Sequence, residues 1–165
     1  MKKLLFLVVP IIVFGCNSSS EEKKGYETGV QEVLDDWHDA ASEADFARYF
    51  SHFADSNSIY MGTDATEHWS VPEFKAFSKP YFDAGRAWNF TPVSRNIMFS
   101  EDGNTAWFDE QLDTPNLGPC RGTGVLVLKN GVWKIAHYNL TVPIPNEIMG
   151  NVKDQIEKAL NTKQE

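Results

Sequence analysis

The sequence has few cysteines, no clustered basic residues and no apolar run long enough to cross a membrane. Two cysteines among 165 residues cannot build a disulfide framework or a four-cysteine zinc site. The 15 basic residues are outnumbered by 23 acidic ones, which gives a formal net charge of -8. This balance excludes a nucleic-acid-binding surface, because phosphate contacts need clustered Lys and Arg. An apolar fraction of 42% excludes a disordered chain.

The first residues have the pattern of an export signal. Met1-Lys2-Lys3 supplies positive charge, and the apolar run over residues 4–14, about 11 residues, is too short to span a bilayer. Val13-Phe14-Gly15-Cys16 resembles the bacterial lipobox, in which a small residue precedes the cysteine that becomes lipid-modified. We therefore expect residues 1–15 to be a lipoprotein signal peptide and Cys16 to be lipidated. The alternative is an ordinary signal peptide cleaved nearby, with Cys16 left free.

The remaining chain divides into three parts. Residues 16–25 are polar and lack apolar periodicity, which predicts a flexible tether. Residues 26–147 form the expected folded domain, and residues 148–165 form a C-terminal helix and tail. Lipidation would anchor the chain in the bacterial cell envelope, on the outer membrane or facing the periplasm, so the membrane is one expected partner.

Helical periodicity dominates the first part of the domain. The stripe that indicates the first helix consists of Tyr26, Val30, Val33, Leu34, Trp37 and Ala41. Asp45 is placed to cap a short second helix, and residues 58–61 predict a brief strand. Ser70 and Glu73 have the spacing of a capping box at the start of a third helix. Pro80 is expected to kink or restart that helix.

From Trp88 onward the apolar period changes from helical to alternating. Four long β segments are expected, at about 88–99, 104–113, 119–129 and 132–142. Asp102-Gly103 and Asn130-Gly131 are typical hairpin dipeptides, so the strands should form an antiparallel meander. Residues 146–160 carry apolar side chains four apart and predict a final helix, which could pack on the domain or project from it.

Together these elements predict an α+β fold in which a cone-shaped, curved antiparallel β-sheet wraps around N-terminal helices. The stretches FADSNSIYMGTDATEHWS, SEDGNTAWFDEQL and RGTGVLVLKNGVWKIAHYNLTVPIPNE resemble the SnoaL-like domain of the nuclear transport factor 2-like superfamily. The resemblance extends over residues 26–147 and implies a cystatin-like α+β barrel. It leaves the activity open, because this superfamily includes isomerases, dehydratases, hydrolases and plain binding modules.

Strand parity predicts a pocket inside the cone. Residues two apart on a strand share a face, so alternate residues of three long strands are expected to point inward. The expected lining residues are Tyr60, Trp88, Trp107, Arg121, Thr123 and Asn139. Asp109 and His137 are the candidate catalytic pair, because a carboxylate beside an imidazole in an apolar cavity can act as acid and base.

The same residues also have a structural interpretation. Asp109 and Arg121 could form a buried ion pair, and His137 could be a core histidine, in a pocket without chemistry. A second cluster, Glu67-His68-Trp69, follows the Gly62-Thr63-Asp64 turn at the expected mouth of the cone. There a loop could close over a ligand, or Asp64 and Glu67 could instead satisfy backbone amides.

The sequence gives no support for a metal site or a phosphate-binding loop. The four histidines are too far apart along the chain for a local metal motif. Gly122-Thr123-Gly124 is followed by an apolar strand where a phosphate loop requires a helix, so it predicts a bend in the sheet. Cys120, beside Arg121, is either a reactive thiol or, more simply, a small core residue. No cofactor is expected.

Three functions follow from these observations. The first is a lipid-anchored domain that binds a small apolar or aromatic ligand in its cone pocket. The second is an isomerase-, dehydratase- or hydrolase-type enzyme that uses Asp109 and His137. The third is oligomerisation or partner binding, as in the related association domain of calcium/calmodulin-dependent protein kinase II. A homodimer is expected because Leu126 and Leu128 would otherwise form an exposed apolar patch on the outer face of the sheet.

Overall fold

The computed structural model describes residues 18–162, with side chains from residue 25 onward. The predicted signal peptide and Cys16 lie outside the described residues. The helices are α1 (Ser18–Ser42), α2 (Phe46–Ser51), α3 (Val71–Asp83), the 3-10 helix η1 (Asn146–Ile148) and α4 (Met149–Thr162). The strands are β1 (Ile59–Met61), β2 (His68–Ser70), β3 (Thr91–Phe99), β4 (Thr105–Thr114), β5 (Gly118–Lys129) and β6 (Val132–Thr141).

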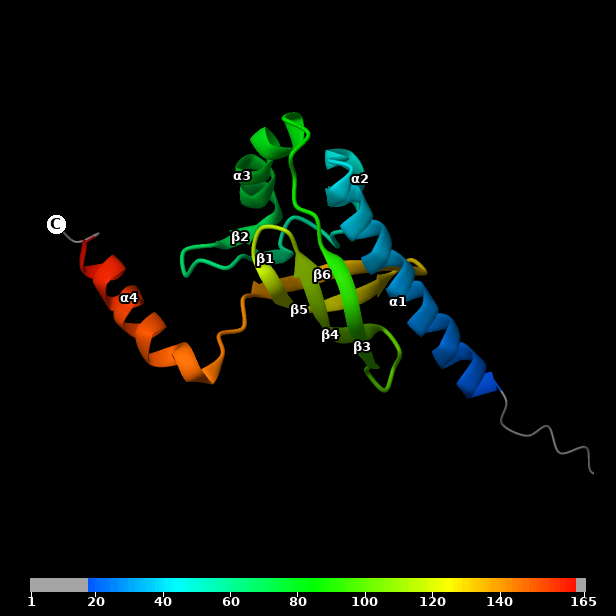
Figure 1. Ribbon diagram of the computed structural model, residues 1–165. Coiled ribbons are helices and arrows are strands. Elements are labelled where there is room, and N and C mark those ends of the chain that lie inside the picture. The colour runs from blue at the N-terminus through cyan, green and yellow to red at the C-terminus, as the bar shows by residue number, and fades with distance from the viewer. Residues whose placement is uncertain (1–17, 163–165) are drawn as a thin grey trace, which may run out of the picture.

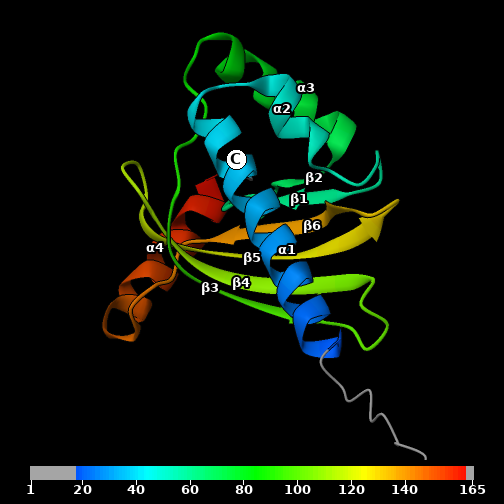
Figure 2. The same ribbon diagram turned by 90° about the vertical axis from the view of Figure 1, so that its right-hand side faces the viewer.

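The six strands form one curved sheet in the order β2-β1-β6-β5-β4-β3. Strands β3 to β6 make the predicted antiparallel meander. The sheet is not wholly antiparallel, however, because β1 pairs with β6 in parallel and β2 then pairs with β1. No turn dipeptide could signal the β1–β6 pairing, since its two strands are more than 70 residues apart. Helix α1 crosses one face of this sheet, and α2 and α3 lie beyond its β1–β2 edge (Figures 1 and 2).

Helix α1 has the predicted apolar stripe, and its residues Val30, Leu34 and Trp37 are almost fully buried against the sheet. It begins at Ser18, eight residues before the predicted start at Tyr26. The predicted flexible tether is therefore helical over most of its length. The run Glu-Glu-Lys-Lys consists of good helix formers, and a helix already nucleated by packing extends through such residues at little cost.

The start signals predicted for α2 and α3 are present. The Asp45 carboxylate accepts the backbone N–H of Arg48 at 3.0 Å, and the Glu73 carboxylate accepts the backbone N–H of Ser70 at 2.8 Å. Helix α3 continues through Pro80 as a single element. Because Pro80 lies in its last turn, only one backbone hydrogen bond near the end of the helix is lost.

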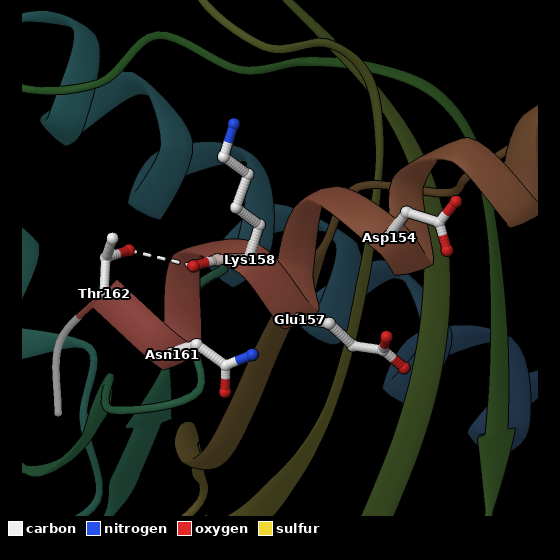
Figure 3. A pocket seen from close by; sticks show the side chains of 5 residues that line it. All are labelled: Asp154, Glu157, Lys158, Asn161 and Thr162. Atoms are coloured by element: carbon white, nitrogen blue, oxygen red, sulfur yellow. Dashed lines mark hydrogen bonds between the residues drawn. The ribbon is translucent and has the colours of Figure 1, made fainter.

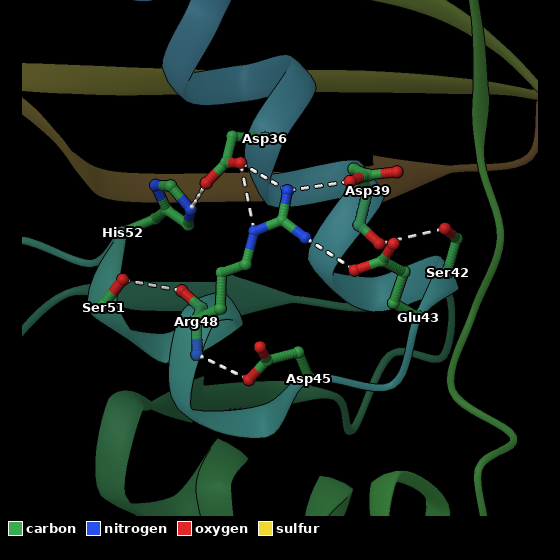
Figure 4. A network of polar contacts seen from close by, with 8 residues as sticks. All are labelled: Asp36, Asp39, Ser42, Glu43, Asp45, Arg48, Ser51 and His52. Carbon is green, nitrogen blue, oxygen red and sulfur yellow. Dashed lines mark hydrogen bonds and ion pairs between the residues drawn. The ribbon is translucent and has the colours of Figure 1, made fainter.

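An ion-pair network joins α1 to α2 on the solvent side (Figure 4). The Arg48 guanidinium contacts three carboxylates. Asp36 and Asp39 belong to α1, and Glu43 directly follows α1. His52 Nε2 lies 2.7 Å from Asp36 Oδ2. The hydrogen bond from Arg48 lowers the pKa of Asp36, while burial lowers the pKa of His52. The network links α2 to α1, and the α2 residues Tyr49 and Phe50 are buried in the core.

Helix α4 projects away from the sheet (Figure 1), and none of its residues is buried. Its predicted apolar stripe, which includes Ile156 and Leu160, is about half exposed. A shallow polar depression on the same helix is formed by Asp154, Glu157, Lys158, Asn161 and Thr162, all from α4 itself (Figure 3). None of the described helices is long and apolar enough to cross a bilayer.

Candidate functional site

The face of the sheet that points into the cone differs from the predicted one. On β4, Phe108, Glu110 and Leu112 are buried beneath α1, whereas Trp107 is 42% exposed and Asp109 lies on the same outer face. The prediction that Trp107 and Asp109 point inward is therefore wrong. Each set of alternate residues on this strand contains an aromatic residue followed by an acidic one, Trp107 and Asp109 in one set and Phe108 and Glu110 in the other. These residue types alone therefore did not identify the buried face.

A β-bulge changes the parity within β6. The register between β5 and β6 shifts between Val125 and Leu126, so Ile135 points inward and His137 does not. A β-bulge places two residues of one strand opposite one residue of its partner. The residues after the bulge therefore point to the opposite faces of the sheet. The prediction for Asn139 is wrong for the same reason, and Arg121 and Thr123 also lie on the outer face of β5.

Several predicted site residues are nevertheless neighbours, on the outer face. Asp109 pairs with Thr123, and Thr123 pairs with Asn139, in one row across three strands. His137 belongs to the adjacent row, where Val125 separates it from Trp107, and Arg121 is opposite Gln111. Asp109 accepts a hydrogen bond from Asn96 at 3.0 Å in an exposed position. The expected Asp109–Arg121 and Asp109–His137 pairs are not formed.

A buried carboxylate does occupy the cone, but it is Glu110. This side chain is completely buried. Its Oε2 accepts hydrogen bonds from Arg95 Nε and Nη2 at 2.9 and 2.8 Å. Its Oε1 accepts hydrogen bonds from His38 Nε2 at 2.9 Å and from Tyr138 Oη at 3.3 Å. Burial opposes the charge of Glu110, but the His38 and Arg95 donors outweigh it, so the pKa of the carboxyl is lowered.

This buried network connects four elements. Glu110 and Arg95 come from β4 and β3, Tyr138 from β6 and His38 from α1, and Arg95 Nη1 also donates to Asp35 at 2.8 Å. Gly122 on β5 leaves the necessary space, because a Cβ there would overlap Tyr138 Oη and lie 2.8 Å from Glu110 Oε1. The sequence predicted a bend in the sheet at these glycines; at Gly122 the close approach of the Tyr138 and Glu110 side chains also requires glycine. Four donors saturate Glu110, and this favours a structural role.

The predicted ligand pocket has its counterpart at the open end of the cone. A cavity of about 310 Å³ lies between α3, the β1–β2 loop, the segment after α3 and the β4–β5 turn. It is within the size range of small-molecule sites. Its aromatic lining residues are Tyr60, Trp69, Phe74, Phe77, Tyr81, Trp88 and Phe90. Of the predicted lining residues, Tyr60 and Trp88 are in this cavity, while Asn139 lines a neighbouring groove on the other side of the β1–β2 loop.

The aromatic rings of the cavity are arranged as a stack. The Tyr60 and Phe74 rings are 3.9 Å apart and nearly parallel, and the Phe74 and Trp88 rings are 5.7 Å apart at an angle of 20°. Trp69 stacks on Phe77 at 4.4 Å. Hydrogen bonding from Trp88 Nε1 to Tyr49 Oη at 3.3 Å fixes the indole at one end. Such parallel surfaces are suited to a flat ligand.

Few polar groups reach this cavity. Glu67 Oε2 accepts the backbone N–H of Asp64 at 3.0 Å, and Gly62 makes room for that carboxylate, so the loop-stabilising interpretation of Glu67 holds. Burial raises the pKa of Tyr60, which keeps its hydroxyl protonated. Within residues 25–162, that hydroxyl has no hydrogen-bond partner. The other lining residues with polar side-chain groups include Thr63, Arg86 and Asn116.

Cys120 and the two leucines of the predicted outer patch pack in or against the core. Cys120 is buried in the core, and burial raises the pKa of its thiol, so it is a core residue. Leu126 is fully buried and Leu128 packs against the core, so the apolar patch predicted from them on the outer face is absent; Trp107 is the large exposed apolar residue there. In the described part of the chain, no group of three or more His, Cys, Asp or Glu side chains is placed to hold a metal ion.

Family comparison agrees with this architecture. The SnoaL-like domain matches residues 30–145. The chain belongs to the SnoaL-like domain family. No curated protein matches this SnoaL-like chain in sequence.

Solved structures with the same fold are similar over most of the domain. A candidate dehydratase of the nuclear transport factor 2-like family from Streptomyces avermitilis has a TM-score of 0.63 at 14% identity, covering 75% of this chain and 99% of that one. A candidate ketosteroid isomerase from Parabacteroides distasonis has a TM-score of 0.55 at 15% identity, covering 70% and 86%. A candidate calcium/calmodulin-dependent protein kinase II association domain from Xanthomonas campestris has a TM-score of 0.53 at 16% identity, covering 71% and 86%. At these identities the likeness shows the fold alone.

Proposed function

We propose that this SnoaL-like domain binds a small, flat, largely apolar ligand in the cavity at the open end of its cone. The observation that carries the proposal is the stack of aromatic rings around about 310 Å³ of space. Several of these rings are partly exposed, including Phe77 and Tyr81. A flat ligand would cover them and extend the existing stack.

The expected affinity follows from the area a ligand would bury. A bicyclic aromatic molecule that buries about 200 Å² of apolar surface gains about 5 kcal/mol from the hydrophobic effect. Stacking adds about 1 kcal/mol for each aromatic contact, and the entropy lost on association offsets part of the sum. The cavity should therefore bind bicyclic probes weakly, with dissociation constants of about 1–10 mM.

The test is a titration of the protein with 2-naphthol, measured by isothermal titration calorimetry. Phe77→Asp places a charge in the cavity wall and should reduce binding by at least about tenfold, because burying an unpaired carboxylate against a ligand is costly. Val132→Asp is the matched control, since Val132 is similarly exposed but is remote from the cavity. Equal affinity in both variants and the parent protein would refute the cavity as the binding site.

An acid–base enzyme is the second candidate function. In this function His38 would be the acid–base group and Glu110 would position it through their 2.9 Å contact, because His38 also lines a groove of about 260 Å³ between α1 and the start of β3. The fold likeness to a candidate dehydratase and a candidate isomerase adds support. Conversion of a β,γ-unsaturated ketone to its conjugated isomer, lost in His38→Gln, would favour this function. Absence of turnover at every pH would favour binding alone.

Anchoring at the membrane is a separate part of the proposal. We propose that Cys16 carries lipid and holds the domain at the cell envelope. The support is the sequence pattern of residues 1–16, namely two lysines, an apolar run and a small residue before the cysteine. A ligand site on such a domain would be held close to the membrane.

A further inference from the structure

The two charged side chains that line the aromatic cavity differ in their surroundings. Glu67 belongs to the β1–β2 loop, and its carboxylate is occupied by the Asp64 backbone amide. Arg86 lies just after α3, and its backbone N–H donates to Tyr81 O at 3.0 Å. Within the described chain, the Arg86 guanidinium makes neither an ion pair nor a hydrogen bond. One cation is therefore available at the cavity wall.

Of the four arginines, Arg48 and Arg95 are paired with carboxylates and Arg86 and Arg121 are not, but only Arg86 of these unpaired two lines the aromatic cavity. Arg48 contacts three carboxylates, Arg95 contacts two, and Lys129 lies 2.6 Å from Asp55. With 23 acidic residues in the chain, carboxylates are abundant partners. Arg86 lines the cavity and has no carboxylate partner in the described chain, so its guanidinium can bind a ligand.

The uncharged polar groups of the cavity are also suited to an anion. The Tyr60 hydroxyl is free of partners in the described structure and can donate a hydrogen bond, and the Asn116 amide supplies N–H donors. Arg86 can add a planar pair of N–H groups that matches a carboxylate. The Glu67 carboxylate would repel an anionic group and the Arg86 guanidinium would attract it, so such a group would be drawn toward Arg86.

We propose that the ligand of this cavity is an aromatic or conjugated carboxylic acid, with its rings in the aromatic stack and its carboxylate bound by Arg86. This inference rests on the proposed binding function and names the chemical class of the ligand. It also gives the bound molecule a defined orientation, since the apolar end must enter toward Phe74 and Trp88.

The experiment compares two probes of nearly equal shape, 2-naphthoate and the neutral 2-naphthamide, in calorimetric titrations of the full chain. The parent protein should bind 2-naphthoate at least tenfold more tightly, because hydrogen bonds to a charged group are stronger than neutral ones. That preference should fall as the salt concentration rises. Arg86→Gln should remove the preference, because it weakens 2-naphthoate binding far more than 2-naphthamide binding, whereas Arg86→Lys should retain part of it.

Arg121→Gln is the matched control, because Arg121 is an exposed arginine on the outer face of the sheet. It changes the net charge by the same amount as Arg86→Gln and should leave the preference intact. Equal binding of both probes by the parent protein, or loss of the preference in Arg121→Gln as well, would overturn the inference but not the proposed function. Failure of both probes to bind would overturn the proposed function itself.

Discussion

Replacing Glu110 by Gln tests whether the buried network in the cone holds the fold together. The change keeps the shape of the side chain and removes its charge. The amide nitrogen of Gln would face donors from Arg95, His38 or Tyr138, so at least one hydrogen bond would be replaced by a repulsive contact. Arg95, only 8% exposed at its side chain, would lose its buried partner.

The expected loss of stability follows from these contacts. Breaking a buried ion pair by removing one partner costs about 3–5 kcal/mol. The remaining pair between Arg95 and Asp35 compensates part of the charge, so the lower half of that range, about 3–4 kcal/mol, is expected. With a urea m-value of about 1.5–2 kcal/mol/M, the unfolding midpoint should fall by about 2 M.

Asp109→Asn is the matched control, because it removes an acidic charge from the preceding residue of the same strand. Asp109 lies on the outer face, so its substitution should change stability by less than about 0.5 kcal/mol. Equal destabilisation by the two variants, or an unchanged midpoint for Glu110→Gln, would refute the assignment of Glu110 to the interior.

The pH dependence provides an independent check. The pKa of Glu110 is lowered in the folded protein, so its contribution to stability is complete above the pKa of the unfolded chain, about 4.3, and is lost as the pH falls toward the folded-state value. The difference in unfolding free energy between the parent protein and Glu110→Gln should therefore shrink below about pH 4. A difference that grows with acidity would contradict the reasoning.

Three further changes have defined outcomes. Gly122→Ala should destabilise the protein by about 1–3 kcal/mol in urea titrations, because its Cβ would collide with Tyr138 and Glu110, whereas Gly150→Ala, with no atom within 4 Å of the added Cβ, should not. Labelled palmitate should enter the parent protein and Cys120→Ala but not Cys16→Ala; incorporation into all three would reject lipidation at Cys16. Sedimentation should show a dimer that Trp107→Lys shifts toward monomer, because Trp107 is a large apolar side chain exposed on the outer face; a monomeric parent protein would exclude this interface.

Local patterns in the sequence were sufficient for most elements of this fold. The apolar stripe of α1, the cap at Asp45, the capping box at Ser70 and the hairpin dipeptides all act over a few residues, so they can be read directly from the chain. The resemblance to SnoaL-like domains assigned the chain to the correct family. The sequence did not predict where α1 begins, because the helix extends beyond its packed apolar stripe by cooperative propagation from the folded part.

The candidate site depended on information that is not local. Which face of β4 enters the cone is decided by packing against α1, and in that packing Glu110 rather than Asp109 meets His38 and Arg95. The bulge in β6 reverses the side of the sheet on which His137 lies. The aromatic cavity combines side chains from β1, α3 and the β4–β5 turn, which come together only in the folded protein. Residue chemistry was therefore visible in the sequence, but tertiary contacts decided which carboxylate is buried and which arginine lines the cavity, because burial and proximity are properties of the assembled sheet and helices.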